Sequence, residues 1–194
     1  TFSRVTDLSI ATRKPLSPDV FTHFPNVNDL DILCGNSPLD LQNIGTMSKV
    51  ERLKIGAGQI SNFEALGQLT NLEQLSIRTS HLSESQMDSL DKGLRKLSKL
   101  KRFVLDVRNT SCSCSGRSIT FTSTQLEDVE VKGIRMTVNV PLAVLLRIRR
   151  DVTCPSVTLC NSEYFFPPIG SAPFPRLRQF RAFSKREEVT IYFN

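Results

Sequence analysis

The residues that most often carry out catalysis are scarce in this chain. Its two histidines are His23 and His81, and neither is accompanied by the serine or cysteine motif that nucleophilic catalysis needs. The segment Gly56-Ala57-Gly58 is too short to cradle a phosphate and is typical of a turn. The sequence therefore predicts a protein that is not an enzyme and that uses no cofactor.

The five cysteines allow three kinds of chemistry. Cys112 and Cys114 could be zinc ligands, a disulfide pair or reduced thiols, and zinc would need further ligands such as Cys154 and Cys160. With Cys34 the cysteine count is odd, which leaves at least one thiol unpaired and favours a reducing compartment. We therefore expect an intracellular protein, cytoplasmic or nuclear, with no bound metal.

The composition indicates one folded domain over residues 1–194. The apolar fraction is 39%, and the 25 basic and 19 acidic residues are interspersed, for a net charge of +6. No apolar run is long enough to span a membrane, and the N-terminus has no signal-peptide pattern. Because the chain starts at Thr1 and not at Met, we expect it to be a fragment of a longer chain.

A short pattern recurs along the whole chain, with apolar residues at its first, fourth and sixth positions. Successive copies start 22 to 28 residues apart, at Val5, Val27, Val50, Leu72, Leu100, Leu126, Cys154 and Leu177. Within each copy the last two apolar residues alternate with a variable one, as in a strand with one buried face. Such strands cannot bury their apolar faces alone, so we expect the copies to stack side by side in parallel.

The segments between the copies contain helix signals. Residues 83–86 resemble a capping box, and apolar residues then recur at helical spacing, at Met87, Leu90, Leu94 and Leu97. A second helix is expected over residues 141–150, because Pro141 suits the first helical position. Residues 62–69 leave room for only a short helix or 3₁₀ segment.

Residues 47–82 carry the clearest family resemblance. The stretch MSKVERLKIGAGQISNFEALGQLTNLEQLSIRTSHL resembles the short repeats of intracellular leucine-rich-repeat proteins, although Gly58 and Ser80 replace the usual asparagine after the strand. This resemblance implies an α/β solenoid with a curved parallel sheet of about eight short strands and with helices and loops on the convex side. The mixed repeat lengths look like those of F-box proteins or nucleotide-binding immune receptors.

The variable strand positions should form the exposed, concave face. The candidate partner-binding residues are Asp29, Asp31, Arg52, Lys54, Gln74, Ser76, Arg78, Arg102, Asp106, Asp128, Glu130 and Lys132. Strands about 4.8 Å apart would place Arg52, Lys54, Arg78 and Arg102 within roughly 10 to 15 Å, close enough to receive an acidic or phosphorylated segment. The alternative interpretation is that these charges keep the face soluble and pair across the strands.

Two segments near the C-terminus suggest further contact sites. Residues 164–175 are rich in proline and phenylalanine and read as an irregular loop, with its aromatic side chains either buried or exposed as a contact site. Residues 189–193 alternate as a strand and would leave an open sheet edge.

The predicted function is protein–protein recognition, and one form of it is the substrate-binding part of a ubiquitin-ligase adaptor. A nucleic-acid-binding leucine-rich-repeat domain is an alternative, but it would need a continuous basic face, which Asp29, Asp31, Asp128 and Glu130 interrupt. An extracellular receptor-type domain is another alternative, which bonded cysteines and a glycan at Asn109 would support.

Overall fold

The computed structural model describes residues 2–108, 117–134 and 137–139, together with the backbone of the strands at 157–159, 179–183 and 188–192. The cysteine pair at 112 and 114, Cys154, Cys160, the helix expected over 141–150 and the segment 164–175 lie outside the described residues. Within the described part, no helix is long and apolar enough to cross a membrane.

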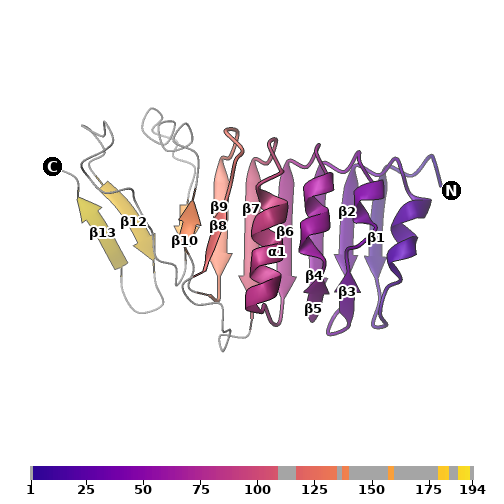
Figure 1. Ribbon diagram of the computed structural model, residues 1–194, viewed down its shortest axis with the longest axis horizontal. Coiled ribbons are helices and arrows are strands. Elements are labelled where there is room, and N and C mark those ends of the chain that lie inside the picture. Colours follow the sequence, from indigo (N-terminus) through magenta and orange to yellow (C-terminus); the bar gives the residue numbers. More distant parts are fainter. Residues whose placement is uncertain are drawn as a thin grey trace.

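The protein is an α/β molecule built on one parallel sheet (Figure 1). The strands are β1 (Asp7–Ala11), β2 (Asp29–Leu33), β4 (Arg52–Ala57), β6 (Gln74–Thr79), β7 (Arg102–Val107), β9 (Asp128–Lys132) and β11 (Val157–Leu159). They lie side by side in chain order, and each comes from one of the first seven copies of the repeated pattern. The parallel sheet that the pattern predicts is confirmed. Side chains are described for the first six strands.

Two features differ from the expected architecture. The sheet is open and not curled (Figure 1), whereas the family resemblance implied curvature. Most connections on its covered face are short 3₁₀ helices, which are too slight to splay neighbouring strands as wide helices would. The eighth copy does not extend the main sheet, because β12 (Gln179–Phe183) pairs antiparallel with β13 (Glu188–Tyr192) in a sheet of two strands. The predicted C-terminal strand is therefore present, but β12 is its partner.

Helices cover one face of the main sheet (Figure 1). They are the 3₁₀ helices η1 (Pro18–His23), η2 (Ile44–Thr46) and η3 (Phe63–Gln68) and the α-helix α1 (Glu84–Leu94). The capping box predicted for α1 is present, with Ser83 at the N-cap accepting a hydrogen bond from the Gln86 amide. Parallel pairs of three-residue strands lie beyond the main sheet: β3 (Pro38–Asp40) with β5 (Gln59–Ser61), and β8 (Ser118–Thr120) with β10 (Thr137–Asn139).

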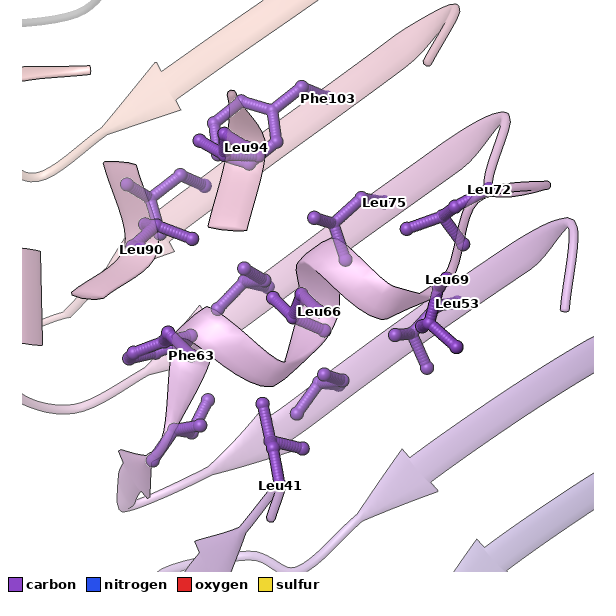
Figure 2. Packing of buried hydrophobic residues seen from close by; sticks show 14 of the residues in the cluster. Leu41, Leu53, Phe63, Leu66, Leu69, Leu72, Leu75, Leu90, Leu94 and Phe103 are labelled. Carbon is purple, nitrogen blue, oxygen red and sulfur yellow. The ribbon is translucent and has the colours of Figure 1, made fainter. Parts of the chain in front are cut away.

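The core lies between the sheet and these helices (Figure 2). Apolar strand residues stand in register across the sheet, as Leu30, Leu53, Leu75 and Phe103 do, and each is at most 2% exposed. Leu66 of η3 and Leu94 of α1 pack against this row from the helical side. The helices therefore bury one face of the sheet and leave the other open.

Close backbone approach explains the glycine at position 58, where the leucine-rich-repeat resemblance would place an asparagine. A Cβ on Gly58 would lie 2.3 Å from the carbonyl oxygen of Asn36, so a side chain has no room there. In the next copy the buried Thr79 hydroxyl donates to the carbonyl oxygens of Gly58 and His81, 3.2 and 3.0 Å away. A threonine hydrogen bond thus joins two copies at the end of the strand, where the usual asparagine is absent.

Candidate functional site

The uncovered side of the main sheet is the candidate site, and we call it the open face. It consists of the outward residues of the six strands β1, β2, β4, β6, β7 and β9. All twelve predicted binding residues lie on it: Asp29, Asp31, Arg52, Lys54, Gln74, Ser76, Arg78, Arg102, Asp106, Asp128, Glu130 and Lys132. Each is exposed or half-buried, because alternate strand residues point away from the core. No described element covers this face.

The strand register arranges the open face in three rows. The first row runs Asp7, Asp29, Arg52, Gln74, Arg102 and Asp128. The second runs Ser9, Asp31, Lys54, Ser76, Val104 and Glu130. The third runs Ala11, Leu33, Gly56, Arg78, Asp106 and Lys132. Neighbours within a row are about 5 Å apart, so opposite charges on adjacent strands can meet.

Ion pairs join neighbouring strands at both ends of these rows, between β2 and β4 and among β6, β7 and β9. From β4, Arg52 donates two hydrogen bonds to Asp29 on β2, and Lys54 lies 3.4 Å from the Asp31 carboxylate. These two cations therefore extend toward the acidic strands at the N-terminal side of the sheet.

The other two cations of the predicted cluster extend the opposite way. Arg102 on β7 lies 3.0 Å from Asp128 on β9, and Arg78 on β6 lies 3.1 Å from Asp106 on β7. The four basic residues share the open face, but they do not form a free basic cluster. The cross-strand pairing of the alternative interpretation is present.

The cations of these four pairs lie above the carboxylates. The Arg and Lys side chains are 54–58% exposed, whereas their Asp partners are only 28–34% exposed. Long basic side chains extend over short acidic ones, which lie close to the backbone. A molecule that approaches the open face therefore meets cations first.

Arg52 and Asp29 also shift each other's pKa. The hydrogen bond from Arg52 holds the pKa of the Asp29 carboxyl below its usual value, and the same bond raises the pKa of Arg52. Both groups therefore stay charged through the neutral and mildly acidic range.

A neutral strip separates the two sets of ion pairs. It is formed by Gln74 and Ser76 on β6 and Val104 on β7. These residues line a broad groove of about 650 Å³ that also reaches Arg52 and Asp29. This volume falls in the range of small-ligand sites, but the groove is an open sheet surface and not an enclosed cavity.

A smaller hollow of about 140 Å³ lies at Gly56, which we call the Gly56 notch. Its walls include Leu33 and Val104, the cations Lys54 and Arg78, and the carboxylates of Asp106 and Glu130. Leu33 is 41% exposed although it is a large apolar residue. Leu33, Gly56 and Val104 were not among the predicted binding residues. The sequence signal that could have found them is a glycine at an outward strand position where neighbouring copies carry side chains.

The described residues that could carry metal or nucleophilic chemistry, two histidines and one cysteine, lie on different elements. His23 ends η1 and His81 follows β6, and no group of three or more possible metal ligands occurs among the described residues. Cys34 is a free, buried thiol, and burial raises its pKa. A raised thiol pKa lowers its reactivity, because the thiolate is the reactive form.

No family model matches the chain, and a search of curated proteins finds no match to it. This is an α/β protein with one mostly parallel, open sheet, covered by helices on one side and bearing cross-strand ion pairs on the other.

Proposed function

We propose that the protein is a recognition module of the leucine-rich-repeat type, which binds another protein through the open face and catalyses no reaction. The observation that carries this proposal is a face of six adjacent strands that no described element covers. Repeat proteins use such surfaces for binding, since each copy adds a strand with variable outward residues to a rigid support. The register of the copies and their spacing of 22 to 28 residues support the repeat assignment.

The proposed ligand is an acidic or phosphorylated segment of a partner protein, because the cations of the open face are more exposed than its carboxylates. An intracellular partner fits the free thiol of Cys34. A role as the substrate-binding part of a ubiquitin-ligase adaptor is an analogy from the repeat lengths and needs its own test.

The ion pairs weigh against nucleic acid as the ligand. A nucleic-acid backbone carries a charge on every nucleotide and needs a continuous basic face, which Asp29, Asp31, Asp106 and Asp128 interrupt. The residues that an extracellular role would use, Asn109 and the cysteine pair beside it, lie outside the described part of the chain.

The test is affinity capture from cell lysate with two matched variants. In the face variant, Arg52, Lys54, Arg78 and Arg102 are changed to Gln, which removes four positive charges without adding like-charge contacts. In the control variant, the exposed Lys14, Lys49, Lys92 and Arg108, which lie outside the strands, are changed to Gln. Circular dichroism first establishes that both variants fold.

We expect a captured protein that binds the wild type and the control variant but not the face variant. Capture that is equal on all three proteins would contradict the proposal. Capture that both variants lose would assign binding to net charge and not to the open face.

A further inference from the structure

The Gly56 notch gives the open face an apolar hollow beside its charges. An ideal Cβ on Gly56 would lie 2.9 Å from Cδ2 of Leu33, so the Leu33 side chain extends over the glycine. Its hollow of about 140 Å³ is smaller than the roughly 300 Å³ at which small-molecule pockets begin. The size and the apolar wall suit a single aliphatic side chain.

Cations stand on two sides of the notch. Lys54 is two residues before Gly56 on β4, and Arg78 is its register partner on β6. These positions are about 7 Å and 5 Å from Gly56, given the rise per strand residue and the spacing between strands. Both side chains are more than half exposed and extend above their paired carboxylates.

From this juxtaposition, and resting on the recognition function above, we propose that the open face binds an extended segment in which one aliphatic residue is flanked by Asp or Glu. The aliphatic side chain enters the Gly56 notch against Leu33. The flanking carboxylates meet Lys54 and Arg78. Interfaces commonly take most of their affinity from one buried anchor surrounded by polar contacts, and the notch and its cations have this arrangement.

The cations favour carboxylates over phosphate. Each cation is already paired with an Asp, so it can offer a ligand only its remaining hydrogen bonds and a partly neutralised charge. A doubly charged phosphate is bound best by a group of unpaired arginines, which this face does not provide among its described residues. An extended chain advances about 3.3 Å per residue, so acidic residues one or two positions from the anchor can reach Lys54 or Arg78.

The proposal can be tested with a phage library of random dodecapeptides selected on the immobilised wild-type protein. Each enriched peptide is then synthesised, and its affinity for the wild type and the face variant is measured by fluorescence anisotropy. We expect enrichment of Asp or Glu within two positions of one aliphatic residue, and loss of binding to the face variant.

Two single variants test the notch. Gly56→Ala narrows it and pushes against Leu33, and the only close contact of the new methyl group is the movable end of that side chain, so the fold has room to adjust. Leu33→Ala removes its exposed apolar wall. In the wild type, an aliphatic-to-Ala change in the peptide should raise Kd about tenfold, the factor that 1.4 kcal/mol gives. In both variants that factor should fall to less than about threefold.

The outcomes separate this inference from the recognition function on which it rests. Two results would overturn the proposal of an anchored acidic segment but leave the open face as a binding surface. In the first, the enriched peptides need the face cations but are neutral or basic. In the second, the aliphatic-to-Ala change in the peptide causes no loss of affinity. Peptides that bind the face variant as tightly as the wild type, or a selection with no enrichment over uncoated support, would count against both this inference and the recognition function.

Discussion

At the scale of single residues, the Arg52–Asp29 pair ties the chemistry of the open face to pH. Asp29 has a lowered pKa, chiefly because Arg52 donates a hydrogen bond to it. The pair's contribution to stability is therefore complete above the ordinary Asp pKa of about 3.9 and is lost as the pH falls through the lower, folded-state pKa. At neutral pH the pair is intact.

The first prediction concerns this titration. In an NMR pH titration, the Asp29 carboxyl of the wild type should titrate below pH 3.9, and in Arg52→Gln its pKa should rise toward that value. Lys14→Gln, an exposed charge removal outside the strands, should leave the Asp29 pKa unchanged. An Asp29 that titrates at the same pH in wild type and Arg52→Gln would show that the hydrogen bond does not form in solution.

The sequence predicts which residues lie on the open face, and it also predicts which of them can form ion pairs across adjacent strands. Asp29 and Arg52 occupy the same place in consecutive copies, so a parallel stack puts them side by side. The direction in which a cation extends follows in the same way: Arg102 has the neutral Gln74 on one side and Asp128 on the other, and it pairs with Asp128. The sequence does not show that the cations stay more exposed than their carboxylate partners. The four cations of the predicted cluster lie on the open face, each paired with an Asp.

At the scale of the elements, α1 depends on the capping box at its start. The Ser83 hydroxyl accepts from the Gln86 amide at 3.3 Å, and Gln86 Oε1 accepts from the Ser83 amide at 2.7 Å. The same Gln86 side chain donates to the carbonyl oxygen of Ile60 at 2.7 Å, which anchors α1 to the strand of the preceding copy.

We therefore predict that Ser83→Ala lowers the free energy of unfolding by about 1 kcal/mol, as N-cap losses do. Gln86→Ala should lower it further, because it removes the bond to Ile60 as well as half of the box. The exposed Ser98, in the turn before β7, is the matched control, and Ser98→Ala should change stability by less than about 0.5 kcal/mol. Urea unfolding followed by circular dichroism measures all three, and equal effects of Ser83→Ala and Ser98→Ala would refute a role for the cap.

A second element-scale prediction concerns the contact between α1 and η3. A Cβ on Gly93 of α1 would lie 2.7 Å from the carbonyl oxygen of Phe63, which belongs to the backbone and cannot move aside alone. Alanine is the better helix former by about 1 kcal/mol, so an isolated helix would gain from Gly93→Ala. In the folded protein the clash should outweigh this gain.

We expect Gly93→Ala to destabilise the protein by about 1 to 3 kcal/mol, the usual effect of overpacking. Lys92→Ala, on the exposed side of the same helix, serves as control and should have little effect. A Gly93→Ala protein as stable as the wild type in thermal denaturation would mean that α1 and η3 separate more easily than their packing indicates.

The sequence predicts the elements unevenly. The recurring apolar pattern indicates the main strands, and the capping box followed by apolar residues at helical spacing indicates α1. It does not indicate η1 or the pairing of β3 with β5. η1 is a short 3₁₀ segment with local bonds, such as that from the Val20 amide to the carbonyl oxygen of Ser17. The hydrogen bonds of β3 and β5 come from neighbouring copies, as when the Leu41 amide donates to the carbonyl oxygen of Ser61. No local pattern encodes such a bond.

At the scale of the whole molecule, each strand is stabilised by its immediate neighbours. Leu53 and Leu75, in strands with a neighbour on both sides, are at most 2% exposed, while Leu8 and Ile10 of β1 are only half-buried. Among the described strands of the main sheet, β1 has a partner on one side only. Its contacts are fewer, so it should open more easily than the middle of the sheet.

The corresponding prediction is a gradient of amide hydrogen exchange across the sheet, with β4 and β6 exchanging slowest and β1 fastest. Leu8→Ala should speed exchange mainly in β1 and β2, because its contacts lie there. Leu75→Ala removes a fully buried side chain from the centre, at a loss of about 2 to 5 kcal/mol, and should speed exchange in every strand. Mass spectrometry of peptic peptides resolves the strands. If Leu8→Ala sped exchange in β6 as much as in β1, the sheet would open as one cooperative unit, and the stack of semi-independent copies would be the wrong description.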